Sequence, residues 1–165
     1  MRNVGCPRPR PGSLHFMPNV PGLRSCYAKV DRLVYVGRMF DKIRLHAAGL
    51  LPAPYVPNLS KGFDARATAF LRVDYADLQA QVLRGIDDAA VLAWAWQKSG
   101  RRSDEECEVW SFFMIKRGWR DASTALLQQR IGEYGLTGKP VETWFDLNDF
   151  DEGRDPVAAR AWEKC

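Results

Sequence analysis

The chain has 165 residues, 46% of them hydrophobic and 27% charged, which is the composition of a globular protein large enough to bury a core. Its longest apolar run, Ala89–Trp96, is much shorter than the roughly 20 residues that a membrane-spanning helix needs. No apolar segment follows the basic N-terminus as it would in a signal peptide, so we expect a cytoplasmic protein without membrane contact.

The cysteines do not indicate a metal site or a disulfide framework. Cys6, Cys26, Cys107 and Cys165 are far apart, and no cysteine or histidine pair has the spacing of a zinc site. The glycine-rich nucleotide motifs, the G-x-S-x-G motif of hydrolases and the H-E-x-x-H motif of zinc proteases do not occur. We therefore expect reduced thiols and no metal, and no motif implies a cofactor.

Charge is distributed unevenly along the chain, although the net charge is only +4. Residues 1–50 contain nine Lys or Arg and two Asp, whereas residues 141–165 contain seven Asp or Glu and three Lys or Arg. One interpretation is a basic arm for nucleic acid combined with an acidic tail. The other, which we favour, is that the two ends of the fold pack together, because the acidic end also contains large apolar residues that require burial.

The elements can be predicted in chain order. Proline and glycine dominate residues 1–25, which are expected to be a flexible arm. From Val30 onward the apolar spacing is helical, and capping residues and glycines mark the ends of the segments. The predicted helices are Leu33–Gly49, Ala65–Leu71, Asp74–Gly85, Asp87–Gly100, Ser103–Gly118, Asp121–Gly135 and Val141–Phe150, and a proline-rich loop precedes Gly62. The Ser103 helix has the strongest signal, since Ser103 and Glu106 form a capping box.

Strand signals are weak throughout the sequence. No segment alternates between polar and apolar residues for more than a few positions, and Asn-Gly and Asp-Gly hairpin turns are absent. The sequence therefore predicts an all-α fold, a single compact helical domain of five to seven helices with a Pro-rich N-terminal arm. The expected boundaries are 1–25 for the arm, 26–154 for the helical domain and 155–165 for a short tail.

The helix that contains RMFDKIRLHAAG places charges opposite its apolar stripe. On a helical wheel, Arg38, Asp41 and Lys42 share one face with Leu45 and Gly49, and such small and apolar residues are unusual on a solvated face. We therefore expect a second element to cover this face. Because buried charges need partners, Asp41 is predicted to pair with Arg38 one turn back, and the remaining cation with a carboxylate or a bound anion.

The C-terminal sequence FDLNDFDEGRD can supply such partners. Asp146, Asp149, Asp151 and Glu152 lie within seven residues. One interpretation is a clasp, in which these acids pair with the basic residues of the RMFDKIRLHAAG helix. The other is a divalent-cation or general acid–base cluster. The clasp is favoured, because the spacing does not fit the calcium loop D-x-[DN]-x-[DN]-G.

Two further kinds of residue could contribute to a site. His46 lies at the edge of the apolar stripe and is the natural general base, although a histidine there is more often a packing residue. Two tryptophans could line an apolar pocket, although aromatic residues at helical spacing are more often core. The candidate polar site comprises Arg38, Asp41, Lys42, Arg44, His46, Asp151, Glu152 and Arg154, and the candidate pocket aromatics are Trp94 and Trp110.

Five segments together resemble a known family. YVGRMFDKIRLHAAG, GFDARATAFL, DDAAVLAWAW, KRGWRD and TWFDLNDFDEGR occur in the order and approximate spacing of the domain of unknown function 5069, a group of small helical bacterial proteins. The similarity covers about residues 22–154. The resemblance implies no established activity, but it implies that the DKIR helix and the DEGR end belong together. Its recurrent polar positions correspond here to Arg38, Asp41, Lys42, Arg44, Gly49, Asp64, Trp94, Trp110, Trp119 and residues 151–154, and Ser111 stands where related sequences often have Asn.

Three functions remain open on this basis. The first is a binding site for a small polar or anionic molecule between the DKIR helix and the DEGR end. The second is a structural or protein-interaction module in which the same charges form only an internal clasp. The third is nucleic-acid binding through the basic arm, which is disfavoured because no helix presents a long basic stripe.

Overall fold

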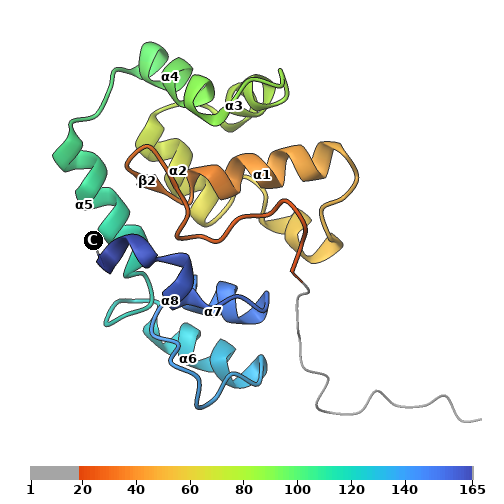
Figure 1. The fold of residues 1–165 in the computed structure, drawn as a ribbon, viewed down its shortest axis with the longest axis vertical. Helices are drawn as coiled ribbons and strands as arrows, with labels where there is room; N and C mark the ends of the chain where they lie inside the picture. The colour runs from red at the N-terminus through yellow and green to blue at the C-terminus, as the bar shows by residue number, and fades with distance from the viewer. Residues whose placement is uncertain (1–18, 165) are drawn as a thin grey trace, which may run out of the picture.

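The computed structural model describes residues 19–164 and shows a mostly helical fold with one small β-hairpin (Figure 1). Residues 1–18, which form most of the predicted arm, lie outside the described residues, as does Cys165. The elements are β1 (Lys29–Val30), β2 (Leu33–Val34), α1 (Val36–Ala47), the 3-10 helix η1 (Ala53–Asn58), α2 (Phe63–Leu71), α3 (Tyr75–Val82), α4 (Asp88–Ser99), α5 (Asp104–Ile115), α6 (Thr124–Glu133), α7 (Trp144–Asp151), α8 (Pro156–Ala159) and the 3-10 helix η2 (Ala161–Lys164).

Local capping signals place several of these helices where the sequence predicts them. The side chains of Asp74 and Asp87 accept hydrogen bonds from the first backbone N–H groups of α3 and α4. The predicted capping box of Ser103 and Glu106 is present at the start of α5. Thr143 and Asp146 form a second capping box at α7. These contacts satisfy backbone donors that have no partner within the helix, which fixes the helix starts.

The prediction for residues 33–49 is wrong at its beginning. Leu33 and Val34 form β2, which pairs antiparallel with β1 so that Val30 lies opposite Leu33. The turn between the strands is possible because Asp31 adopts a positive φ of 52°, a conformation that aspartate tolerates better than most residues. Helix α1 therefore begins only at Val36, and the fold is not purely α-helical.

The predicted domain, residues 26–154, contains seven α-helices, in agreement with the predicted five to seven. An eighth α-helix, α8, lies in the segment predicted as a tail. This segment packs against the domain, because Arg160 pairs with Asp146 at 2.9 Å and the Lys29 ammonium lies 3.5 Å from the ring centroid of Trp162. At the other end, residues 19–25 were expected to be part of the arm, yet Val20 and Leu23 are buried.

Two apolar clusters form the interior. The larger one joins the hairpin and α1 to α2, α3, α4 and α5, and it includes Phe145 of α7. The smaller one lies between α6 and α7 and consists of Leu127, Ile131, Val141 and Leu147. In Figure 1, α1 runs through the middle of the molecule, with α3 and α4 on one side of it and α6 and α7 on the other. The first helix is thus enclosed by later parts of the chain.

The two oppositely charged ends meet, in agreement with the favoured interpretation of the charge distribution. Ser25 donates a hydrogen bond to Asp149 at 2.6 Å, and Arg154 donates to the Leu23 carbonyl at 2.5 Å. None of the helices in the described part of the chain has the length and apolar character needed to cross a lipid bilayer.

Candidate functional site

The first ion pair of the site joins Arg38, in the first turn of α1, to Glu152, directly after α7. Arg38 Nη1 donates to Glu152 Oε2 at 3.0 Å and Nη2 donates to Oε1, so the pair is bidentate, and both side chains are buried. Glu152 also accepts hydrogen bonds from the Tyr55 hydroxyl at 2.7 Å and from Arg154. Burial raises the pKa of Glu152, but the hydrogen bonds and charge of Arg38 outweigh burial, so the pKa lies below its ordinary value.

The second buried pair lies one turn further along α1. Lys42 Nζ is 2.6 Å from Asp64 Oδ1 in the first turn of α2 and donates to the Tyr35 hydroxyl at 3.1 Å. Asp64 also accepts hydrogen bonds from the Tyr35 hydroxyl at 2.9 Å and from the Ser60 backbone N–H at 3.1 Å. Burial lowers the pKa of Lys42 below its ordinary value despite the adjacent carboxylate.

Two residues that hold this second pair have an unusual backbone conformation. Tyr35 has a φ of 66° and Ser60 a φ of 61°, and positive φ is rare for residues other than glycine. The Tyr35 ring packs against Phe63 and Phe145, with centroid distances of 5.3 and 5.9 Å. Backbone strain of this kind clusters at binding and active sites, and here both strained residues contact the same buried Asp64.

Both ion pairs border one cavity of about 430 Å³. It lies where α1, η1 and the start of α2 meet α6 and α7. Arg38, Lys42 and Glu152 form buried parts of its wall, whereas Lys61 and Arg130 are exposed. Three tyrosines, two asparagines and two apolar aromatic rings also line it, namely Tyr35, Tyr55, Tyr134, Asn58, Asn148, Phe63 and Trp144.

The charges that line the cavity are mixed but predominantly positive. The cations are Arg38, Lys42, Lys61 and Arg130, and the carboxylates are Asp151 and Glu152. The carboxylate of Glu152 is occupied by Arg38, Tyr55 and Arg154, whereas no ion pair within residues 19–164 involves Lys61. The cavity therefore offers cationic donors beside flat apolar surfaces, which is a suitable environment for an anionic group on a small organic molecule.

The predicted pairing of Asp41 with Arg38 is wrong. Asp41 instead accepts hydrogen bonds from Arg24 Nε and Nη2, both at 2.7 Å, and from the Arg24 backbone N–H at 3.0 Å. Arg24 reaches Asp41 across Gly37, where a Cβ atom would lie 2.7 Å from Arg24 Nη1. The absence of a side chain at Gly37 therefore lets a residue from outside the helix displace the expected intrahelical partner.

A separate surface network includes Asp41 and Arg44. Arg24 Nη2 lies 2.6 Å from Asp88 Oδ2, and Arg44 Nη2 lies 2.8 Å from Asp88 Oδ1. Arg24 and Arg44 are each about a third exposed, at 35% of the side chain. None of these four residues lines the 430 Å³ cavity, so the structure does not bring Asp41 and Arg44 together with Arg38 and Lys42 in its wall.

The remaining candidates are divided between the cavity and other places. Asp151 lines the cavity, and Arg154 lies behind Glu152, also donating to Asn19 at 3.1 Å. His46 is exposed in the last turn of α1 and does not line the cavity. Trp94 and Trp110 pack at the edge of the larger apolar cluster, outside this cavity, and Trp110 also lines an apolar hollow beside α5.

Asp149 is a buried acid that does not line the cavity. It accepts a hydrogen bond from Ser25 at 2.6 Å and lies 3.8 Å from Arg154, but its Oδ1 atom makes no hydrogen bond in the described structure. Burial raises the pKa of Asp149 to about 6. Asp149 and Glu152 both lie next to Arg154, but their pKa values shift in opposite directions, and only Glu152 is paired with Arg38 and Tyr55.

Several cavity residues could not be predicted from the sequence. Tyr55 lies in the proline-rich segment PAPYVPN, and its position between prolines indicates a restricted backbone. Asp64, which pairs with Lys42 but does not itself line the cavity, was indicated only by the family resemblance. Lys61 and Arg130 have no distinguishing local pattern. Among residues 19–164, no group of three or more His, Cys, Asp and Glu side chains is arranged to hold a metal ion.

Comparison with known proteins identifies one family. Residues 20–154 match the family model described as a domain of unknown function, number 5069. No curated protein and no solved structure matches the chain. The match includes both ion pairs of the cavity and most of the chain, and it agrees with the resemblance seen in the sequence. The chain therefore belongs to the domain of unknown function 5069 family.

Proposed function

We propose that the 430 Å³ cavity binds a small organic molecule that carries a carboxylate or phosphate group. The observation that carries this proposal is that two buried cations from adjacent turns of one helix, Arg38 and Lys42, both border the same cavity. A volume of this size suits a small-molecule ligand, for which pockets of about 300–1,000 Å³ are typical.

The arrangement of the cations supports an anionic ligand. Arg38 and Lys42 are already paired with Glu152 and Asp64, so their remaining donor capacity orients a ligand rather than supplying a full charge. Lys61 is exposed and supplies the uncompensated charge, while Arg130 shares its charge with Glu133 at 2.6 Å. A ligand anion would thus contact Lys61 first and the buried donors next.

The cavity wall supports an organic rather than a purely inorganic ligand. Phe63 and Trp144 provide flat apolar surface, and the hydroxyls of Tyr35 and Tyr55 donate to the carboxylates of the two buried pairs. Asn58 and Asn148 also line the cavity, and amide groups place hydrogen bonds in defined directions, which gives specificity.

The hydrogen bonds of Glu152 also support the clasp interpretation. Glu152 accepts hydrogen bonds from η1, α1 and Arg154, so it ties the C-terminal turn to the first helix. This role is compatible with ligand binding, because the same ion pair forms one wall of the cavity. As an alternative function, the clasp alone would make the domain a structural or interaction module.

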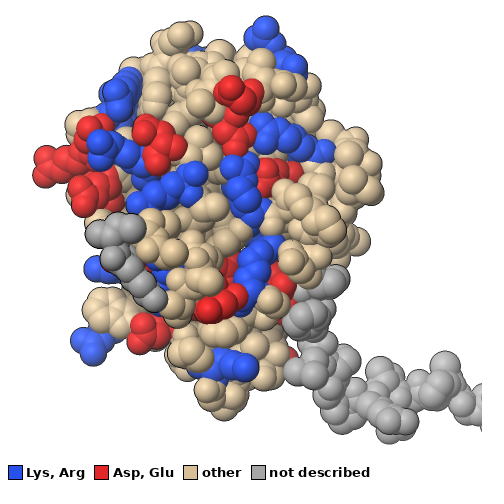
Figure 2. Space-filling view, viewed as in Figure 1, with Lys and Arg blue, Asp and Glu red and all other residues tan. Residues whose placement is uncertain are grey.

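Nucleic-acid binding through the arm depends on residues 1–18, which lie outside the described residues. The face shown in Figure 2 carries Lys and Arg side chains interspersed with Asp and Glu rather than one broad basic patch. This mixture does not favour a phosphate-backbone interface on that face.

Isothermal titration calorimetry with two probes, inorganic phosphate and succinate, tests the proposal. We expect at least one probe to bind with one site per chain. We further expect Lys61→Gln to weaken binding about three- to tenfold, since an exposed charge contact contributes roughly 0.5–1.5 kcal/mol. Lys139→Gln is the matched control, because Lys139 is also exposed but does not line the cavity.

The two functions predict different results from the same titration. If neither probe binds at millimolar concentration, or if Lys61→Gln and Lys139→Gln bind equally well, the anion site is excluded and the clasp alone explains the buried charges. Native mass spectrometry of the protein purified from cells then identifies any small molecule that is retained in the wild type and lost in Lys61→Gln.

A further inference from the structure

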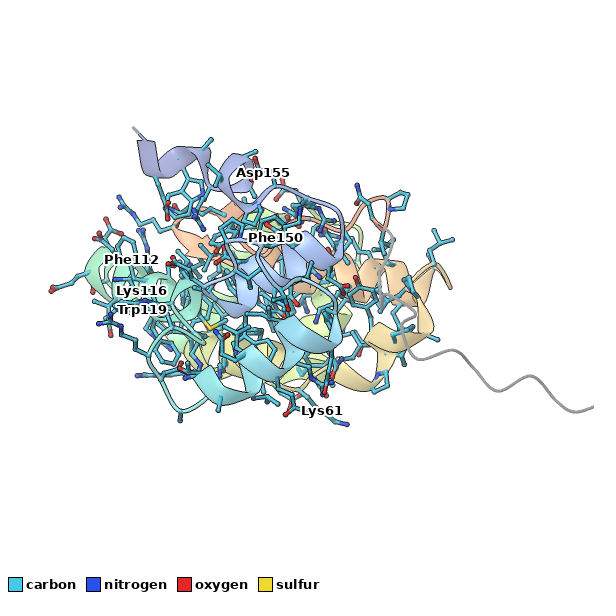
Figure 3. The ribbon with its side chains drawn as sticks, turned by 90° about the horizontal axis from the view of Figure 1, so that it is seen from below. Lys61, Phe112, Lys116, Trp119, Phe150 and Asp155 are labelled. Atoms are coloured by element: carbon cyan, nitrogen blue, oxygen red, sulfur yellow. The ribbon has the colours of Figure 1, made fainter. Side chains whose placement is uncertain are left out.

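The outer face of α5 carries an exposed apolar stripe that is separate from the cavity. Val109, Phe112 and Phe113 are 64%, 42% and 45% exposed, although each is large and apolar. In Figure 1, α5 forms one edge of the molecule, and Figure 3 shows Phe112 and Lys116 together at that edge, far from Lys61. An apolar surface of this kind is uncommon unless it binds something.

Charges flank this stripe with opposite sign at its two ends. Glu105, Val109, Phe112 and Lys116 follow one another at intervals of four, three and four residues, so they lie along one side of the helix. Acidic side chains gather over the N-terminal half of α5 at the left edge of Figure 2. Within residues 19–164, neither Glu105 nor Lys116 forms an ion pair.

The pattern is self-complementary when it is reversed. Glu105 and Lys116 lie at equal distances from the midpoint of the stripe, as do Val109 and Phe112. In two antiparallel copies, Glu105 of one helix therefore faces Lys116 of the other, twice, and Val109 faces Phe112, twice. A parallel arrangement would instead place like charges opposite each other, which is unfavourable.

We propose that the outer face of α5 binds the same face of a second copy of the chain, antiparallel across a twofold axis. Such an isologous interface uses one patch on both subunits and requires this kind of self-complementarity. The surface beside α5 is also shaped to receive a side chain. A hollow lined by Phe70, Val109, Trp110 and Phe113 adjoins the stripe, and the partner's aromatic side chain at position 112 would fill it.

The charge arrangement selects a second copy over other occupants. The chain's own residues 1–18 contain three Arg and no acidic residue, so their charge would match only the acidic half of the stripe. An unrelated partner needs no internal symmetry between the two halves of α5. The twofold relation between Glu105 and Lys116 is the arrangement that an antiparallel second copy requires.

Charge-reversal variants of the full chain test this interface by sedimentation velocity over a range of protein concentrations. We expect wild type to show a concentration-dependent monomer–dimer equilibrium. Glu105→Lys and Lys116→Glu should each raise the dimer dissociation constant by about tenfold or more, because each places two like-charge contacts across the interface. A 1:1 mixture of the two variants should dimerise again, since the mixed pair restores both opposite-charge contacts.

Further variants make the outcome decisive. Val109→Glu also disrupts the stripe without altering the first turn of α5, so it should be monomeric even if Glu105→Lys affects the helix start. Glu142→Lys is a charge reversal at an exposed residue outside α5 that forms no ion pair within residues 19–164, so it should leave dimerisation unchanged; circular dichroism confirms that each variant is folded. A monomeric wild type at all concentrations, or a mixture of variants that fails to dimerise, overturns the proposal.

Discussion

Arg38 and Glu152 form a buried, bidentate ion pair that connects the first turn of α1 to the residue directly after α7. The two residues are 114 positions apart in the sequence. Tyr55 of η1 donates a hydrogen bond to the same carboxylate, so three distant parts of the chain converge on Glu152. The pair therefore has two roles: it closes the fold, and it forms part of the cavity wall.

Glu152→Gln should destabilise the protein by about 3–5 kcal/mol. The substitution keeps the shape of the side chain but removes its charge, so the buried Arg38 guanidinium loses its counter-ion, and breaking one side of a buried pair has this order of cost. Chemical denaturation at neutral pH measures the effect. Glu142→Gln, at an exposed position, serves as the control and should change the free energy of unfolding by less than about 0.5 kcal/mol. If Glu152→Gln lowers the free energy of unfolding by less than about 1 kcal/mol, the Arg38–Glu152 pair contributes little to holding the C-terminal turn against α1.

The Lys42–Asp64 pair is expected to behave as one unit in a double-mutant cycle. Lys42→Met alone leaves the fully buried Asp64 without its cation and should cost about 3 kcal/mol or more. Lys42→Met combined with Asp64→Asn removes both charges. The amide oxygen of the introduced asparagine can still accept from the Ser60 backbone N–H, and its amide N–H can donate to the Tyr35 hydroxyl, which no longer accepts from Lys42. The double variant should therefore be more stable than the single Lys42→Met variant. Thermal unfolding of the wild type, the two single variants and the double variant provides the measurement, and additive losses would contradict the coupling.

The burial of the charged face of α1 could be predicted, but not the reason for it. The wheel argument relied on Leu45 and Gly49, yet Gly49 is exposed and Leu45 is only partly buried. Arg38, Asp41 and Lys42 are buried because residues 19–24, η1, α2 and the end of α7 surround the first turns of the helix. A helical wheel gives the face on which residues lie, but it contains no information on which part of the helix is covered.

Partners across the fold were harder to predict than helix starts. A cap such as Ser103 with Glu106 is local, so sequence spacing alone determines it. The partner of Asp41 is Arg24, which lies in the segment expected to be a flexible arm, and only the space above Gly37 allows the contact. The hairpin could not be predicted from the sequence either. Its two strands have two residues each, which is too short to show an alternating pattern.

Asp149 should make the stability of the protein depend on pH between about 4 and 6. Burial raises its folded-state pKa from 3.8 to about 6, so in this range the folded protein holds a proton that the unfolded chain has already released. The stability contributed by protonated Asp149 is therefore fully present below about pH 4 and is lost as the pH rises through 6. Asp149→Asn should consequently raise the stability at pH 7.5 by up to about 3 kcal/mol and have little effect near pH 4.

Thermal unfolding of wild type and Asp149→Asn across this pH range measures the difference. The Ser25 hydroxyl can still donate to the amide oxygen of the introduced asparagine, so the main hydrogen bond is retained. Asp31→Asn is the matched control, because Asp31 is exposed, forms no ion pair within residues 19–164 and has a positive φ that asparagine also tolerates; it should have only a small effect at both pH values. A destabilisation by Asp149→Asn at pH 7.5 would mean that the contact with Arg154 outweighs the cost of burying the charge.

Gly37→Ala should destabilise the protein, although alanine is the better helix former. The new Cβ atom would lie 2.7 Å from Arg24 Nη1 and 2.9 Å from Val30 Cγ2, so Arg24 and the hairpin would both have to move. We expect a cost of about 1–3 kcal/mol, as for overpacking of a tightly packed site. Gly132→Ala in α6 is the matched control: a Cβ atom there would meet no other atom within 4 Å, so alanine should stabilise the protein by about 0.5–1 kcal/mol.

The double variant Arg24→Ala/Gly37→Ala separates the two sources of strain at this position. If contact with the guanidinium dominates, Gly37→Ala should cost much less in the Arg24→Ala background than in the wild type. If the contact with Val30 of β1 dominates, the cost should be the same in both backgrounds. Because Arg24 donates to Asp41 and to the Gly37 carbonyl, we expect the first result, with chemical denaturation as the measurement. Equal costs would show that Gly37 is required by the hairpin rather than by the Arg24–Asp41 contact.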